Sequence, residues 1–226
     1  MTFDWNTIDV VIFDVDGTLY NQSRLRRQMT RSLLSHYALR PWQAYDLQVI
    51  RIFRKEREKM CLDQVSNLEE AQYQRCAQKI NVAPQKVKQI ISKWMYQAPL
   101  PHLQACSYPG IQMFFNAMKK RGIKIAIYSD YPATDKLAAM GLEADLVVAS
   151  TDESIDALKP NPAGLSYILT TFNTTPERCL FFGDRDELDG ACARQAGMPY
   201  YILTETDKQT NFYSALAESV ATPQPV

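Results

Sequence analysis

Five short apolar runs, rich in β-branched and aromatic residues, leave few folds open to this chain. They occupy residues 10–13, 123–128, 146–149, 179–182 and 200–203. Each run is short and lacks helical spacing, so each predicts a buried strand. Helical patterns lie between these runs, the clearest being Ile111, Phe114, Phe115 and Met118 before the second run. Strands that alternate with helices predict a Rossmann-like α/β fold, in which helices cover both faces of a parallel sheet.

The alternation is interrupted once, between the first and second predicted strands. From Arg24 to about Tyr96 four helical patterns follow one another without a strand, and Pro41, Asn67 and Pro84 stand where helices should begin. We therefore expect an all-helical domain, residues 21–104, to be inserted into an α/β core that consists of residues 1–20 and 105–226.

The charge distribution fits this division. The whole chain has 25 Lys and Arg and 25 Asp and Glu, but residues 21–104 hold 15 of the basic residues and only 6 of the acidic ones. A neutral chain without a nucleic-acid-binding motif argues against a nucleic-acid partner. The basic excess of the helical insert predicts attraction between that insert and an acidic core or an anionic ligand.

Targeting signals are not evident. The five cysteines form no CxxC pair, the first residues lack a basic segment followed by an apolar run, and no run reaches the length of about 18 apolar residues that a membrane span needs. These features predict reduced thiols, no membrane partner and a cytoplasmic location.

Polar residues follow the predicted strands. Asp14 and Asp16 follow the first strand, Ser129 and Asp130 close the second, and Asp184 and Asp189 follow the fourth. Ligands of open parallel sheets bind at the carboxyl ends of the strands, so these side chains should meet there. Four carboxylates at one edge repel one another and need a cation, and oxygen ligands without His or Cys favour Mg²⁺. Lys159, expected at the start of the helix after the third strand, could supply positive charge to the same place.

These residues form four motifs in a recognisable order. Asp14-Val15-Asp16-Gly17-Thr18 after a strand, Ser129 at the end of the next, Lys159 before Pro160, and Gly183-Asp184 followed by Asp189 resemble the motifs of the haloacid dehalogenase superfamily. The motifs span most of the chain. They also frame an insert where members of this superfamily carry a helical cap of the C1 type.

The resemblance implies a hydrolase that removes phosphate from a small-molecule ester. Asp14 would be the nucleophile that forms an aspartyl-phosphate, and Asp16 would act as general acid and base. Ser129 and Lys159 would bind the phosphoryl oxygens. Because Asp16 stands where dehalogenase members carry another residue, the motif favours phosphate ester chemistry.

The resemblance also implies a Mg²⁺ site. Asp14, the backbone carbonyl of Asp16 and the carboxylate of Asp184 would bind the ion, and Asp189 would orient metal-bound water.

Two positions depart from the usual pattern of the superfamily. Asp156 stands three residues before Lys159, where glycine is frequent, and Asp130 follows Ser129, where an amide-bearing residue is common. Asp130 is therefore a candidate substrate contact. Tyr20 and Asn21, just past the first motif, are further candidates, because the cap side of the site should select the substrate.

Other functions remain open. A phosphomutase of the same superfamily would use the same aspartyl-phosphate, and a catalytically idle interaction protein could retain the fold. His36 and His102 lie outside the strand-end loops, which argues against a Ser-His-Asp hydrolase or a zinc site. The sequence does not identify the ester or the oligomeric state.

Overall fold

The computed structural model describes residues 3–40, 45–61 and 65–222. Its centre is a five-stranded parallel sheet in the order β3-β2-β1-β4-β5. The strands are β1 (Val10–Phe13), β2 (Lys124–Ser129), β3 (Leu146–Ala149), β4 (Cys179–Gly183) and β5 (Tyr200–Ile202). The predicted parallel α/β core is confirmed, and β1 and β3 have the predicted bounds. β4 and β5 differ from the prediction by one residue at one end, and β2 is shifted by one residue at both ends.

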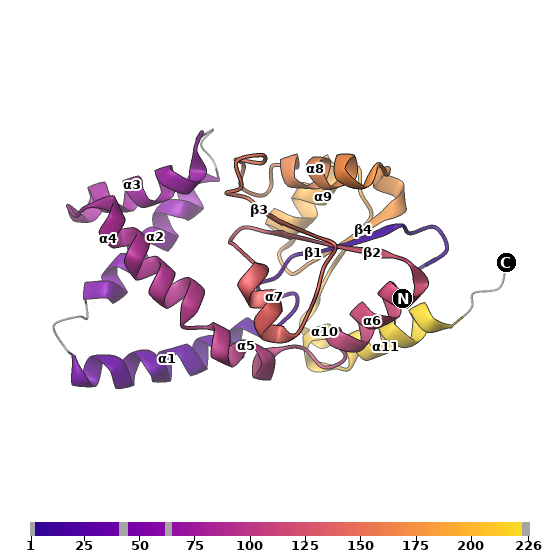
Figure 1. Ribbon diagram of the computed structural model, residues 1–226, viewed down its shortest axis with the longest axis horizontal. Coiled ribbons are helices and arrows are strands. Elements are labelled where there is room, and N and C mark those ends of the chain that lie inside the picture. Colours follow the sequence, from indigo (N-terminus) through magenta and orange to yellow (C-terminus); the bar gives the residue numbers. More distant parts are fainter. Residues whose placement is uncertain (1–2, 41–44, 62–64, 223–226) are drawn as a thin grey trace.

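Helices cover both faces of the sheet, as Figure 1 shows for α8 on one side and for α6 and α11 on the other. One face packs on α6 (Ile111–Arg121), α7 (Thr134–Met140) and α11 (Phe212–Ala221). The other packs on α8 (Ala163–Phe172) and α9 (Ala191–Gln195). The remaining short helices of this part are η3 (Pro176–Arg178), η4 (Asp186–Gly190) and α10 (Glu205–Gln209). Burial of β1 between two helical layers explains why its four residues are all apolar.

Between β1 and α6, the elements that the structure describes are all helices. The helices are α1 (Gln22–Leu39), α2 (Tyr45–Met60), α3 (Leu68–Ile80), α4 (Pro84–Ile91), η2 (Ser92–Gln97) and α5 (Leu100–Cys106). The predicted starts of helices near Asn67 and Pro84 are confirmed, since α3 begins after Asn67 and α4 begins at Pro84. The start predicted at Pro41 lies outside the described residues.

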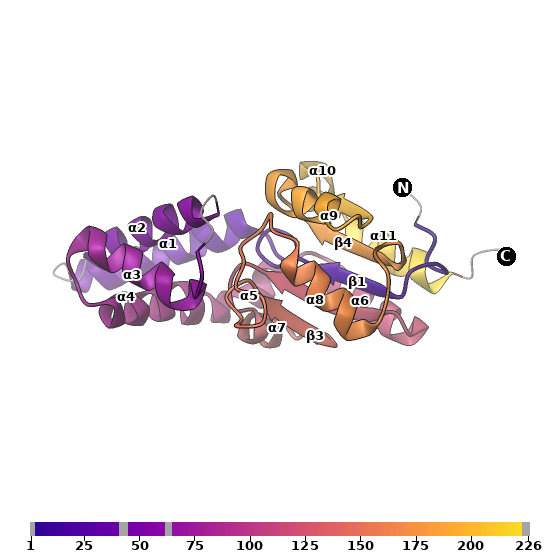
Figure 2. The ribbon, with the colours of Figure 1, turned by 90° about the horizontal axis from the view of Figure 1, so that it is seen from above.

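Helices α1 to α4 gather at one end of the molecule, beside the sheet-containing part, in both views (Figures 1 and 2). They enclose an apolar core of their own, around Val49, Phe53, Cys76, Val87 and Ile91. Leu25, the buried residue of α1, and Leu103 and Cys106 of α5 pack instead into the apolar core between the sheet and α6. Among the described residues, no helix combines the length and the apolar character needed to cross a bilayer.

Candidate active site

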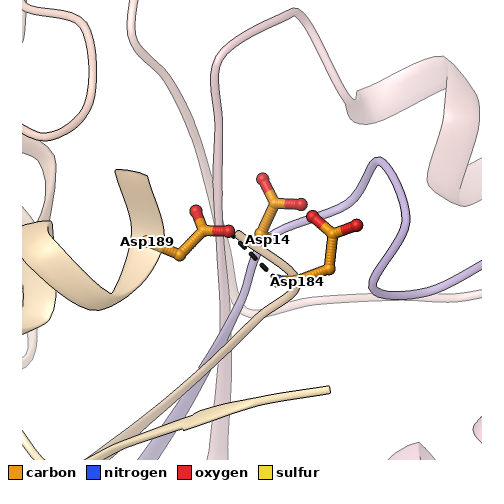
Figure 3. A group of neighbouring side chains, drawn as sticks. All are labelled: Asp14, Asp184 and Asp189. Atoms are coloured by element: carbon orange, nitrogen blue, oxygen red, sulfur yellow. Dashed lines mark hydrogen bonds between the residues drawn. The ribbon is translucent and has the colours of Figure 1, made fainter. Parts of the chain in front are cut away.

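Three carboxylates meet at the carboxyl edge of the sheet. Asp14 follows β1, Asp184 follows β4, and Asp189 lies in η4. One carboxylate oxygen of each lies within 4.8 Å of the others (Figure 3). The strand register explains part of this arrangement, because Phe13 pairs with Phe182 and the Asp14 N–H donates to the Phe182 carbonyl (2.8 Å). Asp14, Asp184 and Asp189 are therefore brought together as the sequence predicts.

Lys159 lies inside this cluster. Its ammonium is 2.7 Å from Asp14 Oδ1 and 2.8 Å from Asp189 Oδ1, and only 1% of the residue is exposed. Burial alone would lower the pKa of Lys159, but the carboxylates of Asp14 and Asp189 outweigh it and raise the pKa well above its usual value. Lys159 therefore carries its positive charge at neutral pH.

The placement of Lys159 on a helix was wrong. Helix α8 begins only at Ala163, so Lys159 lies in the loop between β3 and α8. The reason is local, because a residue before proline is disfavoured in the helical conformation and Pro160 follows Lys159. A loop position leaves Lys159 free to extend toward the strand ends.

One lysine does not neutralise three carboxylates. Burial raises the pKa of Asp14 well above its usual value, Lys159 opposes this, and the charges of Asp189 and Asp184 raise it further. Burial also raises the pKa of Asp184, although Lys208 opposes this effect from 3.4 Å. A cation would relieve this repulsion, and the oxygen donors suit Mg²⁺. The residues present therefore fit a magnesium site.

Asp16 faces a different partner. Its Oδ1 accepts from the ammonium of Lys136, a residue of α7 that is 6% exposed, and from the Tyr20 hydroxyl. Burial would raise the pKa of Asp16, but Lys136 and the two hydrogen bonds lower it. The Asp16 carboxylate is thus held in an ionised form beside the Asp14 cluster.

The loop that carries Asp14 and Asp16 is fixed by its own residues and by the end of the chain. The Thr18 hydroxyl donates to Asp14 Oδ2 (3.2 Å), and the buried Tyr213 of α11 donates its hydroxyl to the Thr18 carbonyl (2.7 Å). Gly17 has φ +97°, a backbone conformation in which glycine is favoured. These contacts turn the chain sharply away from β1 and leave the two aspartates at the sheet edge.

Ser129 and Asp130 lie where β2 ends, at the same edge as Asp14. The Ser129 hydroxyl accepts the Tyr131 N–H (3.3 Å), and Asp130 Oδ1 accepts from Ser150 (3.0 Å). The Asp130 carbonyl accepts from Arg57 of α2. Substrate contact by Ser129 or Asp130 stays a prediction.

Tyr20 and Asn21 have structural partners. The buried Tyr20 bonds Asp16, as above, and the Asn21 side chain accepts the Arg24 N–H (2.8 Å) as the N-cap of α1. Their predicted role in substrate binding is not tested by these contacts.

Two cationic residues near the site, Lys136 and Arg57, were not predicted from the sequence. Arg57 is 4% exposed, donates to Gln72 and to the Asp130 carbonyl, and lies over the Tyr131 ring with its guanidinium carbon 4.4 Å from the ring centroid. Both residues lie on helices, whereas the predicted site residues follow strand ends. The signal that could have found Lys136 is its position in the first turn of the helix that follows Ser129.

Comparison with known proteins is consistent with this geometry. A model of the haloacid dehalogenase-like hydrolase family matches residues 8–197. A phosphoglycolate phosphatase of Rhodospirillum rubrum is 28% identical over 112 residues, which are 48% of this chain and 46% of that protein. The validoxylamine A 7'-phosphate phosphatase of Streptomyces hygroscopicus subsp. limoneus is 24% identical over 203 residues, 87% of this chain and 86% of that protein.

The chain matches most of these curated phosphatases over less than half of their own length, between 36% and 47%. Among solved structures, a 2-haloacid dehalogenase from Pseudomonas syringae pv. Tomato DC3000 has a TM-score of 0.62 at 17% identity, covering 95% of this chain and 98% of that one. At this identity the likeness shows a shared fold.

Proposed function

The chain belongs to the haloacid dehalogenase-like hydrolases, and on this premise we propose that it is a Mg²⁺-dependent phosphatase of small phosphate esters. The observation that carries the proposal is the buried Lys159 ammonium between Asp14 and Asp189, with Asp184 beside them. Both relatives described above are named for the removal of phosphate from a small molecule. These names support the same substrate class here.

In the first step, an oxygen of the Asp14 carboxylate attacks the phosphorus of the ester. The bond between phosphorus and the ester oxygen breaks, and Asp16 gives its proton to the leaving alkoxide. Lys136 lowers the pKa of Asp16 against the effect of burial, so the protonated carboxyl that this step uses is the minor form in the resting site and a strong proton donor. Lys159 and Ser129 bind the phosphoryl oxygens, and Lys159 offsets the charge that gathers on them.

In the second step, water attacks the phosphorus of the aspartyl-phosphate. Asp16, now ionised, accepts the proton of this water, the bond between phosphorus and Asp14 breaks, and inorganic phosphate leaves. The ion pair with Lys136 favours the ionised form that this step requires. One carboxyl group thus serves both proton transfers.

Asp14, Asp184 and the Asp16 carbonyl would hold Mg²⁺. Asp189 would not bind the ion directly but would orient the ligands of the ion. When bound, Mg²⁺ offsets the negative charge of the carboxylates and of the phosphoryl group. Asp189 is suited to the orienting role, because its Oδ2 accepts the backbone N–H groups of Asp184 and Arg185, both at 3.1 Å. These bonds fix the loop that carries Asp184.

We assign residues 21–104 as a cap that selects the ester, with 1–20 and 105–226 as the core; α5 crosses this boundary and packs its Leu103 against the core. The assignment is supported by the separate apolar core of α1 to α4 and by cap contacts with the loops after β2 and β3. Arg57 of the insert bonds the Asp130 carbonyl, and Tyr20, which directly precedes the insert, bonds Asp16. Closure of such a cap excludes water from the reaction.

The proposal is tested by a screen of phosphate esters for release of inorganic phosphate, with Mg²⁺ and with excess EDTA. We expect turnover of at least one ester, loss of turnover in EDTA, and recovery when Mg²⁺ is restored. Asp184→Asn should raise the Mg²⁺ concentration for half-maximal rate at least about tenfold. Asp186→Asn, a change at an exposed carboxylate two residues away, should leave it unchanged.

The same screen separates the alternatives. A phosphomutase would rearrange an ester and release little inorganic phosphate. A catalytically idle protein would turn over no ester at any Mg²⁺ concentration. Turnover that persists in EDTA would contradict the metal assignment.

Gly17→Ala is expected to lower phosphatase activity about 100-fold, because misplacement of a catalytic group by about 1 Å has an effect of this size. A Cβ at Gly17 would lie 2.0 Å from Asp184 Oδ2, so the loop or the carboxylate must move. Gly122→Ala is the matched control, since Gly122 also has a positive φ (+80°) but no atom within 4 Å of the new Cβ. Steady-state rates of the two variants should differ, while equal rates would show that the clash is harmless.

A further inference from the structure

A carboxylate of the core occupies the N-terminus of a cap helix. Asp156, in the loop between β3 and α8, accepts the Asn67 N–H with Oδ2 and the Leu68 N–H with Oδ1, both at 2.6 Å. The first N–H groups of a helix have no partner within the helix, and an acidic side chain stabilises them. The Asn67 side chain forms no capping hydrogen bond of its own, so Asp156 provides the cap of α3 from another part of the chain.

The backbone at Asp156 makes this contact specific. Its φ is +44°, in the left-handed region that glycine adopts most readily and aspartate tolerates better than most residues. A glycine would satisfy the backbone but would leave the two N–H groups of α3 without this acceptor. The aspartate therefore adds a contact that the turn itself does not need.

The same loop segment reaches the catalytic centre. Leu158, two residues on, is buried against Met60 of α2 and Leu68 of α3. The next residue is Lys159, which binds Asp14 and Asp189. Residues 156–159 therefore join the start of α3, the end of α2 and the phosphoryl site within one short stretch of chain.

We propose that Asp156 is a positioning residue, which holds the cap closed over the phosphoryl site by capping α3 from the core. The inference rests on the phosphatase function proposed above. Opening of the cap must break both hydrogen bonds to Asp156 and expose Leu158. Loss of the carboxylate should therefore favour the open form and weaken the hold on a bound ester, while the chemistry at Asp14 is unchanged.

The test compares Asp156→Gly, Asp156→Asn and the wild-type chain by hydrogen exchange and by steady-state kinetics with p-nitrophenyl phosphate and Mg²⁺. In Asp156→Gly, amide exchange in residues 67–72 should accelerate about tenfold, the size expected for loss of a helix cap. Exchange in β2 should stay as in the wild type. KM should rise by about the same factor, with a smaller change in kcat.

Two further variants serve as controls. Asp156→Asn keeps one acceptor oxygen and should remain within about threefold of the wild type. Glu153→Gln removes an exposed carboxylate from the same loop and should change neither exchange nor KM.

Three results for Asp156→Gly would each overturn the inference. Amide exchange in residues 67–72 could be as slow as in the wild type, or exchange in the sheet could accelerate as much as in residues 67–72. The third such result is an unchanged KM. A wild-type chain that hydrolyses neither p-nitrophenyl phosphate nor any ester of the screen overturns the proposed function itself, and the positioning role with it. Turnover by the wild type with an unchanged KM in Asp156→Gly overturns the positioning role alone.

Discussion

Replacement of Asp14 by asparagine is expected to reduce the release of inorganic phosphate at least about 1000-fold, as for the loss of other covalent nucleophiles. An amide has nearly the shape of the carboxylate but does not attack phosphorus. Because burial raises the pKa of Asp14, a neutral group is tolerated at this position and the variant should stay folded. The measurement is phosphate release from the best ester of the screen, with Mg²⁺ present.

Asp9→Asn is the matched control, since Asp9 precedes the same strand at its opposite end and pairs with Arg178. It should keep wild-type activity. Mass spectrometry of the quenched reaction should find a phosphorylated peptide that contains Asp14 in the wild type and none in Asp14→Asn. Substantial activity in Asp14→Asn would end the assignment of the nucleophile.

Replacement of Lys159 by methionine should reduce activity about as strongly and should also destabilise the fold. The change leaves the buried carboxylates of Asp14 and Asp189 without their shared ammonium. Removal of one partner from a buried ion pair costs about 3–5 kcal/mol. Chemical denaturation near pH 7 would measure this loss, and Lys124→Met, at an exposed ion pair with Asp145, should change stability by less than about 1 kcal/mol.

The loss of stability in Lys159→Met should depend on pH. Burial raises the pKa of Asp14 and Lys159 opposes this effect, so without Lys159 the pKa of Asp14 rises further above its unfolded value. The folded state then binds a proton more readily than the unfolded state, and acid favours folding. The difference in unfolding free energy between the wild type and Lys159→Met should therefore shrink as the pH falls from about 7 toward 5. A deficit independent of pH would mean that lost packing, and not charge, is responsible.

Much of the site could be predicted because parallel strands end at one edge. Asp14, Asp184 and Asp189 follow β1 and β4, which are neighbours in the sheet, so convergence follows from strand order. The strands themselves were evident because a strand buried on both faces leaves an uninterrupted apolar run.

Contacts made by helices were harder to foresee. Lys136 lies 120 residues from its partner Asp16, and Asp156 lies 88 residues from Leu68. Helical spacing shows which residues share a face but not which distant part of the chain that face meets. The start of α8 was also misplaced, because Pro160 delays the helix and the apolar pattern carries no sign of the delay.

The last helices have a consequence for work with shortened chains. The family match ends at residue 197, yet Tyr213 and Lys208 beyond it bond Thr18 and Asp184. A recombinant chain trimmed to the matched region would lose the Tyr213 hydroxyl that holds the loop after β1 and the Lys208 ammonium beside Asp184. Cloning limits for this chain therefore need to follow the three-dimensional contacts and include helices α10 and α11.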